Sequence, residues 1–222
     1  MADSTWNAPE TVAGFSGSPP NAALLRFVER ERKRRPILRI LDIGCGAGRN
    51  AGPLADSGVH IVGTDLSWEM LRAAQSRPRQ ADAGLQVVLS PMDILPVRNR
   101  SFDLLIAHGI WNLARSGAEF RRAVREAARV SRQGAGLFVF TFSRNTLPAE
   151  ASPLPGETFV FTQFSGRPQC FLTEAELLSE LAACGFAPDP ATPLTEHNRP
   201  RPGNLGRAGG PVIYQGAFRL TV

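Results

Sequence analysis

Lysine, cysteine and long apolar runs are scarce in this sequence of 222 residues. Its three cysteines are an odd number at wide spacings, without a CxxC pair, so they indicate neither a metal site nor a disulfide framework. No apolar stretch approaches the ~20 residues that span a bilayer, and the polar segment 1–15 lacks the apolar core of a signal peptide. These absences predict a cytoplasmic protein with reduced thiols and no membrane contact.

The positive charge rests almost entirely on arginine, because Lys33 is the single lysine among 25 basic residues. A formal net charge of +5 is compatible with a nucleic-acid or anionic partner. The arginines are spread along the chain, however, and the densest basic run, residues 30–35, has the pattern of a solvated helix end. We therefore expect no nucleic-acid partner.

From residue 38 onward, short apolar runs alternate with helix-like segments, which is typical of parallel strands joined by helical crossovers. Parallel strands are predicted at residues 37–43, 60–64, 85–89, 102–107 and 136–142. Helices are predicted at residues 21–35, 48–57, 67–77, 117–132 (with Gly134 as its stop) and 173–184. Residues 211–222 and the segment around Phe186 are expected to form a C-terminal hairpin. The expected fold is therefore α/β, with a seven-stranded Rossmann-like sheet, mostly parallel with an antiparallel C-terminal hairpin, and helices on both faces.

The chain is expected to divide into an N-terminal cap segment and helix, residues 1–36, and a main ligand-binding domain, residues 37–222. Residues 1–22, with Gly, Ser and Pro, are expected to form an irregular cap. The segments 143–169 and 188–210 lack core periodicity and follow the fifth and sixth strands, where loops carry specificity. The first holds three aromatic candidates for a short strand or lid, and the second holds four basic candidates for contacts to an anionic acceptor, although a mobile solvated loop is the favoured interpretation. These residues are Phe159, Phe161, Phe164, His197, Arg199, Arg201 and Arg207.

The strongest motif is the run 42–50, Asp-Ile-Gly-Cys-Gly-Ala-Gly-Arg-Asn, in which a buried strand leads into three alternating glycines and a helix. Glycines let the backbone turn sharply and a ligand approach closely, at the edge where open α/β sheets bind ligands. A dinucleotide fingerprint requires Gly or Ala at its sixth position, but Arg49 stands there. Asp42 would repel a pyrophosphate and attract an ammonium group, such as the one that S-adenosylmethionine (SAM) carries besides its sulfonium. Cys45 is interpreted as a small packing residue that supplies a backbone N–H.

Two more carboxylates follow predicted strands at the same edge. Asp65, 23 residues after Asp42 (65 − 42), ends the second strand, where a carboxylate can accept hydrogen bonds from both ribose hydroxyls. Asp93 follows the third strand and is a candidate acceptor for an adenine amino group, with Met92 and Ile94 packed on the ring. Each aspartate taken alone could instead cap a loop, start a helix or occupy a surface turn. The prediction therefore depends on the series as a whole.

Together these features resemble the motif series of class I SAM-dependent methyltransferases: strand-Asp-x-Gly-x-Gly-x-Gly, an acidic end to the second strand, an aspartate after the third, and Phe-Asp-Leu-Leu-Ile-Ala-His at 102–108 on the fourth. The resemblance covers residues 37–142, and the C-terminal hairpin fits it too. The continuation Gly48-Arg49-Asn50 resembles that of tellurite-resistance-type and related small-molecule methyltransferases. The resemblance implies a class I methyltransferase fold, SAM as cofactor and a small-molecule methyl acceptor.

The resemblance also implies where the cofactor lies. The loop after the first strand would face its methionine part, the end of the second strand its ribose, and the turn after the third strand its adenine. The end of the fourth strand would lie beneath the methionine part. The residues expected to bind the cofactor are Asp42, Gly44, Cys45, Gly46, Asp65, Leu66, Met92, Asp93, Ile94, Ala107 and His108.

No catalytic dyad is evident, and none is required. Positioning supplies much of the acceleration of a group transfer, and a base is needed only when the acceptor must lose a proton. His108 and Trp111 are the substrate-side candidates, His108 as a base or as a pocket-lining residue and Trp111 as a pocket wall. An Asn/Asp-Pro-Pro-aromatic motif, typical of nucleic-acid amino-methylating enzymes, does not follow the fourth strand. The alternatives left open are an RNA or protein methyltransferase, a non-catalytic SAM-binding protein, and a nicotinamide-dependent dehydrogenase, which Asp42 and Arg49 disfavour.

Overall fold

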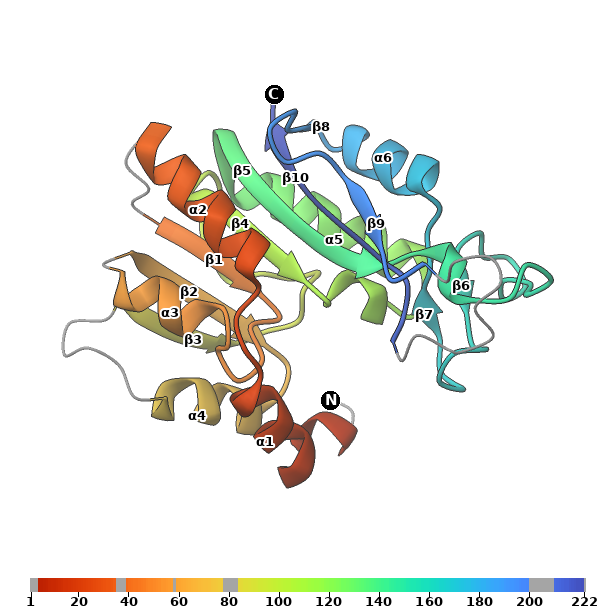
Figure 1. Cartoon of the computed structure of the whole chain (residues 1–222), viewed down its shortest axis with the longest axis horizontal. Coiled ribbons are helices and arrows are strands. Elements are labelled where there is room, and N and C mark those ends of the chain that lie inside the picture. The colour runs from red at the N-terminus through yellow and green to blue at the C-terminus, as the bar shows by residue number, and fades with distance from the viewer. Residues whose placement is uncertain (1–3, 35–38, 58, 78–83, 200–209, 222) are drawn as a thin grey trace.

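The centre of the computed structural model is an eight-stranded sheet in the order β3-β2-β1-β4-β5-β10-β8, with β9 also paired to β10 (Figure 1). The strands are β1 (Arg39–Ile43), β2 (His60–Asp65), β3 (Leu85–Leu89), β4 (Phe102–His108), β5 (Ser131–Phe142), β8 (Phe186–Pro188), β9 (Thr195–His197) and β10 (Ile213–Leu220). Strands β1 to β5 run parallel to one another, whereas β10 runs antiparallel to β5, β8 and β9. The structure describes residues 4–34, 39–57, 59–77, 84–199 and 210–221.

The mostly parallel sheet with an antiparallel C-terminal strand pair is confirmed, but its strand count is eight rather than seven. The additional strand is β9, which pairs residues 195–197 with the first half of β10, while β8 pairs with the second half. Part of the predicted loop 188–210 is thus sheet structure. Residues 200–209, with the candidates Arg201 and Arg207, lie outside the described residues.

Helices cover both faces of the sheet. The α-helices are α1 (Pro9–Gly17), α2 (Ala22–Arg34), α3 (Ala51–Asp56), α4 (Trp68–Ser76), α5 (Gly117–Val130) and α6 (Glu174–Ala182). Helices α2 and α3 bury Phe27 and Leu54 against one face, together with Ile40 and Phe138 of the sheet. Helices α5 and α6 bury their apolar sides in the larger core on the other face. Among the described residues, no helix is both long and apolar enough to cross a membrane.

Local side-chain caps explain where three helices begin. The hydroxyl of Ser67 accepts a hydrogen bond from the backbone N–H of Met70 at the start of α4, and Ser116 caps α5 in the same way. The predicted capping box at α6 is present, with Thr173 and Glu176 each bonded to the other's backbone N–H. These caps place the helix starts within one residue of the predicted ones, apart from α3, which begins at Ala51 instead of residue 48.

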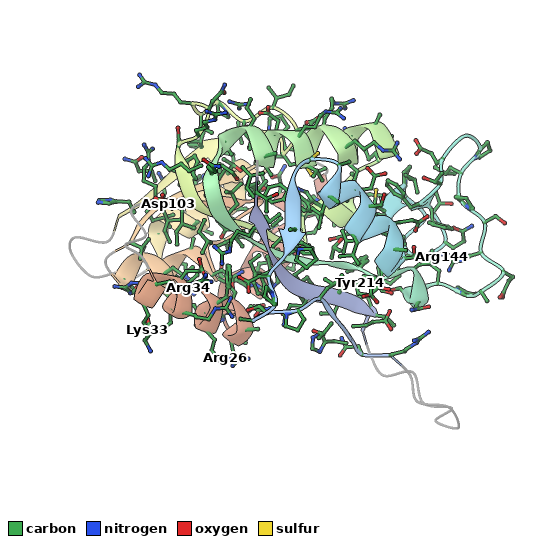
Figure 2. All side chains as sticks on the ribbon, turned by 90° about the horizontal axis from the view of Figure 1, so that it is seen from above. Arg26, Lys33, Arg34, Asp103, Arg144 and Tyr214 are labelled. Carbon is green, nitrogen blue, oxygen red and sulfur yellow. The ribbon has the colours of Figure 1, made fainter. Side chains whose placement is uncertain are left out.

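Residues 30–34 of the basic run end helix α2, as predicted, while residue 35 lies outside the described residues. Lys33 lies 3.5 Å from Glu29 and Arg34 lies 3.3 Å from Glu31, and both basic side chains extend from α2 (Figure 2). Arg30 instead donates to the buried carboxylate of Asp189 at 3.2 Å. The run is therefore divided between a solvated helix end and an internal ion-pair cluster.

The expectation of an irregular cap at residues 1–22 is wrong. This segment contains the 3₁₀-helix η1 (Ser4–Asn7) and helix α1, which lies beside α4 (Figure 1). Pro9 stands at the first turn of α1, where its missing N–H has no helical partner to lose. None of the residues of α1 is buried, so its position depends on contacts at its edges rather than on a core.

The predicted helix 117–132 ends early, and Gly134 is not its stop. Helix α5 ends at Val130, and β5 begins at the next residue. Gly134 has a φ of 71° inside β5, where the pairing with β4 shifts register between Phe102 and Leu104. A positive φ favours glycine at such an irregularity, so the glycine accommodates a bulge in the strand.

The segment 143–169 is packed more closely than its composition predicts. It holds the 3₁₀-helix η3 (Arg144–Thr146) and strand β6 (Val160–Phe161), which pairs with β7 (Gln169–Cys170). Phe159 and Phe161 are buried, whereas Phe164 is 46% exposed. Of the alternatives for these phenylalanines, the structure has the short strand.

Candidate functional site

The site lies where the strand order reverses. β1 and β4 are neighbours in the sheet, while the strands that continue from them lie on opposite sides. At such a switch point the loops diverge and leave a crevice at the carboxyl ends of the strands. The predicted ligand residues Asp42 on β1 and Ala107 and His108 on β4 sit at this edge, since Ile43 pairs with Ala107. The tertiary structure thus brings the first and fourth motifs side by side.

The glycine loop after β1 turns through left-handed backbone. Gly44, Gly46 and Gly48 have φ values of 69°, 52° and 73°. A Cβ at Gly44 would come within 2.6 Å of the Ile110 side chain, whereas one at Gly46 would meet atoms no closer than 4.0 Å. Gly44 is therefore required for packing and conformation, and Gly46 lies in more open space. Between them, Cys45 is buried and donates its backbone N–H to Thr64 at 2.8 Å.

Asp42 is a buried carboxylate without a hydrogen-bond partner at Oδ2 among the described residues. Only 1% of the residue is exposed. Burial, followed by the nearby charge of Asp65, raises its pKa to about 7, and the charge of Arg49 opposes this. An unpaired buried carboxylate is costly, so the site is poised for a cation or a proton.

Asp65 joins the glycine loop to the end of β2. Its Oδ2 accepts the backbone N–H of Gly46 at 2.9 Å, and its Oδ1 accepts that of Ser67 at 2.8 Å. Burial raises its pKa, while these backbone hydrogen bonds lower it. The carboxylate keeps lone pairs for further donors. Its predicted contact with ribose hydroxyls therefore stays a prediction that the geometry permits.

The predicted adenine side is apolar and partly open. Ile94 is 68% exposed and Met92 is buried, while Leu66, which is predicted to lie at the ribose, is 46% exposed. Exposed large apolar side chains beside a site are available to a flat ring. The carboxylate of Asp93 is engaged at 3.0 Å by Arg122 of α5. Its predicted bond to an amino group thus competes with an existing ion pair and stays a prediction.

His108 is held neutral by its surroundings. Arg49 Nη2 lies 3.2 Å from its Nδ1, and Asn21 Nδ2 lies 3.0 Å from its Nε2. The ring also stacks on Phe140 with 4.2 Å between centroids. Burial, followed by the charge of Arg49, lowers the pKa of His108 to about 3. A neutral imidazole has one N–H and one acceptor nitrogen, so only one of these two donors forms a hydrogen bond to it. With so low a pKa, the ring is a weak base near neutral pH.

Asn21 connects four elements at this edge, and sequence reasoning missed it. Its Oδ1 accepts from the first backbone N–H groups of α2, and its Nδ2 donates to Gln215 of β10 at 2.7 Å. Its own backbone N–H donates to Asn50 at 2.9 Å. Asparagine before a helix is a recognisable cap signal, but the sequence could not place that cap beside His108. Gln215 carried no signal of its own.

Trp111 lies deeper than predicted. It is fully buried in 3₁₀-helix η2 (Trp111–Leu113) and packs edge-to-face on Phe120 at 6.0 Å. Its indole N–H has no hydrogen-bond partner among the described residues. The ring therefore underlies the region after β4, and its role as a pocket wall stays a prediction.

A polar cluster follows β5 at the same end of the sheet. Glu196 of β9 accepts from Ser143 Oγ at 2.5 Å and from Asn145 Nδ2 at 2.6 Å. Arg199, a candidate contact for an anionic acceptor, lies 3.5 Å from Glu196. Tyr214, next to this cluster on β10, lies at one end of the sheet, while Asp103 lies at the other (Figure 2). Arg199 thus already has a carboxylate partner.

The N-terminal segment lies over the glycine loop. Phe15 of α1 reaches the space beside Gly46, 4.0 Å from where a Cβ would stand. Ser67 donates its hydroxyl toward Asn7 Oδ1 at 2.7 Å, and Arg77 donates to the carbonyl of Ser16 at 2.8 Å. The N-terminal segment is therefore attached by polar contacts to the two residues that flank helix α4, Ser67 and Arg77.

A glycine loop at the switch point of a mostly parallel sheet, with an acidic residue before the first glycine, defines a Rossmann-like ligand-binding domain. Residues 40–134 match the family model described as "Methyltransferase domain". These residues are therefore similar to a methyltransferase domain, for which the sequence predicts SAM as the cofactor. The buried, unpaired carboxylate of Asp42 and the open backbone at Gly46 fit the positively charged end of such a cofactor.

Sequence relatives include a demethylmenaquinone methyltransferase of Corynebacterium urealyticum, 34% identical over 131 residues, which are 55% of this chain and 52% of the relative. A ubiquinone biosynthesis O-methyltransferase of Azorhizobium caulinodans is 30% identical over 165 residues, 72% of this chain and 64% of the relative. The chain thus spans roughly half to somewhat under two thirds of these relatives.

The fold is similar to that of solved methyltransferases. A 1,6-didemethyltoxoflavin-N1-methyltransferase of Burkholderia thailandensis, solved with 1,6-didemethyltoxoflavin and S-adenosylhomocysteine, superposes with a TM-score of 0.66 at 20% identity and covers 99% of this chain and 85% of its own. A SAM-dependent methyltransferase of Methanosarcina mazei gives a TM-score of 0.62 at 24% identity, covering 82% and 91%. At sequence identities of 20% and 24%, the similarity to these two structures shows the fold alone.

Proposed function

We propose that this protein transfers the methyl group of SAM to a small-molecule acceptor. The observation that carries the proposal is Asp42, a buried carboxylate with an unpartnered oxygen at the switch point of the sheet. A buried charge without a partner is retained where a ligand supplies the partner. The names of relatives that act in menaquinone, ubiquinone and toxoflavin methylation support a small-molecule acceptor.

The chain's own residues offer a distinct partner for each part of the cofactor. We propose that Asp42 accepts the ammonium group and that the loop 44–46 lies along the methionine part. Asp65, fixed by two backbone N–H groups, would accept the ribose hydroxyls. The apolar side chains of Met92 and Ile94 would pack on adenine, with Asp93 near its amino group. When bound, SAM supplies a methyl group on a sulfonium, which makes that methyl electrophilic.

The role of the protein in catalysis is mainly positioning. The low pKa of His108 leaves its imidazole neutral and weakly basic, so we infer that it orients its neighbours instead of accepting the proton of the acceptor. Holding a nucleophile in line with the methyl group can supply much of the acceleration without a base. The acceptor would enter beside the ends of β4 and β5, near the polar cluster of Ser143 and Glu196.

Calorimetry tests the cofactor first. We expect SAM and S-adenosylhomocysteine to bind the full chain in the micromolar range or tighter, and NAD not to bind. Binding of NAD instead would overturn the proposal in favour of a dehydrogenase.

A radiolabelled-methyl screen then tests acceptors, with quinols, phenols, nitrogen heterocycles, bulk tRNA and protein. Label on tRNA, with affinity that falls steeply with salt, would favour the macromolecular alternative.

A further inference from the structure

The side chain of Arg49 is a partly buried cation without an anionic partner. Among the described residues, no carboxylate oxygen lies within 4.0 Å of its guanidinium. Burial lowers its pKa, and the charge of Asp42 opposes this. Other arginines do have carboxylate partners, such as Arg122 with Asp93 and Arg219 with Asp189. Within the part of the chain that the structure describes, Arg49 has no such counter-ion.

Among the described residues, the side chain that lies within hydrogen-bond distance of Arg49 is that of His108, and it is neutral. Arg49 Nη2 lies 3.2 Å from Nδ1 of His108 and 3.4 Å from Nε2 of the same ring. A neutral imidazole orients the guanidinium but does not balance its charge. Within the described residues, the Nη1 and Nε donors of Arg49 have no protein acceptor at all. The N–H groups of Nη1 and Nε are therefore left for a ligand.

The opposite unpaired charge is close by. Asp42 and Arg49 influence each other's pKa, yet they form no ion pair, and Oδ2 of Asp42 is unpartnered among the described residues. Two opposite charges that share a crevice without joining are complementary to a ligand that carries both signs. The α-amino acid group is such a ligand, with an ammonium and a carboxylate on one carbon.

We propose that Arg49 binds the α-carboxylate of the cofactor's amino-acid end, while Asp42 receives its ammonium. This inference rests on the proposed function and adds a residue to it. Hydrogen bonds from a guanidinium to a carboxylate are charge-assisted and strong, and the free Nη1 and Nε donors of Arg49 are available for them. His108, and through it Asn21, then acts as a positioning residue that aims the guanidinium.

The test compares two ligands that differ only in the carboxylate. They are S-adenosylhomocysteine and its decarboxylated analogue, in which hydrogen replaces that group. For the wild-type chain, calorimetry should give about 10- to 100-fold weaker binding of the analogue, the range expected for charge-assisted hydrogen bonds. In Arg49→Gln, the affinity for S-adenosylhomocysteine should fall to that for the analogue. The two affinities should then differ by less than about threefold. Arg49→Lys should retain part of the preference.

Arg72→Gln on α4 is the matched control, because it removes the same charge from an exposed side chain that pairs with Glu69. It should keep the wild-type preference. Equal loss of affinity for both ligands in Arg49→Gln would overturn the inference and assign Arg49 to loop structure. Equal affinities in the wild type would overturn it without any variant. If neither ligand binds the wild type, the proposed function itself fails.

Discussion

Nη2 of Arg49 lies 3.2 Å from Nδ1 of His108, so a cation faces the histidine that ends β4. The cation adds to burial in lowering the pKa of the imidazole to about 3. The strand that ends with His108 is thereby coupled to the loop that follows β1. Catalysis and cofactor binding are expected to share this contact.

His108 should titrate far below neutral pH and contribute little as a base. Its imidazole signals, followed by NMR, should show no protonation between pH 5 and 8. His108→Gln, which keeps an acceptor for Arg49, should lower the rate of methyl transfer by less than about tenfold, whereas loss of a general base typically costs 100-fold or more. A rate loss of that size, with an inflection near pH 6 to 7, would assign the proton transfer to His108.

The same low pKa predicts a loss of stability in acid. The native pKa of about 3 lies below the value of 6.5 for an unperturbed histidine, so between these values the unfolded chain binds more protons than the native one. Stability should then decrease as pH falls from 6.5. Urea unfolding of the wild type and of His108→Gln from pH 4 to 7 measures this contribution as their difference.

Asp42→Asn should stabilise the ligand-free protein at high pH and lower its affinity for SAM. The native pKa of about 7 lies above 3.8, so the native state holds the extra proton between these values, and stability falls as pH rises through them. The stability of the variant relative to wild type should increase by on the order of 4 kcal/mol from pH 4 to pH 8. Urea unfolding at both pH values checks it, and parallel pH profiles would contradict it.

Asp65→Asn should lower the affinity for SAM and destabilise the glycine loop. The substitution alters an acceptor of two backbone N–H groups and removes the charge offered to the ribose. We expect a loss of about 10- to 100-fold in SAM affinity and a lower melting temperature. Glu69→Gln, a nearby exposed carboxylate on α4, is the control and should change neither. Unchanged SAM affinity in Asp65→Asn would rule out the ribose contact.

Residues 159–161 and 169–172 should be protected from hydrogen exchange in the free protein. Phe159 and Phe161 are buried, and the backbone N–H of Phe171 donates to the carbonyl of Phe159 at 2.9 Å. This expectation replaces a mobile lid over residues 143–169, since buried aromatic side chains offset the entropy of ordering the chain. Rapid exchange at these amides that slows only when cofactor and acceptor bind together would support a mobile lid instead.

Local pattern was sufficient to predict the sheet and the cofactor loop. Strands with continuous apolar runs, glycines that need positive φ at Gly44 and Gly46, and the caps at Ser67 and Thr173 are all properties of short sequence windows. They predicted five parallel strands, the C-terminal pair and the carboxylates Asp42 and Asp65 at one edge. Short elements escaped this reasoning: β9 has three residues, and α1 buries none, so neither leaves a clear apolar period.

Only the tertiary structure decided which charged and polar side chains lie close together. Asn21, Arg49 and His108 are far apart in the sequence, and only the neighbouring positions of β1 and β4 and the capping of α2 bring them into one network. The same packing gave Asp93 a partner in Arg122 and, among the described residues, left Oδ2 of Asp42 without a hydrogen-bond partner. Charge compensation depends on distances of a few ångströms across elements, and a sequence specifies those distances only once the chain has folded.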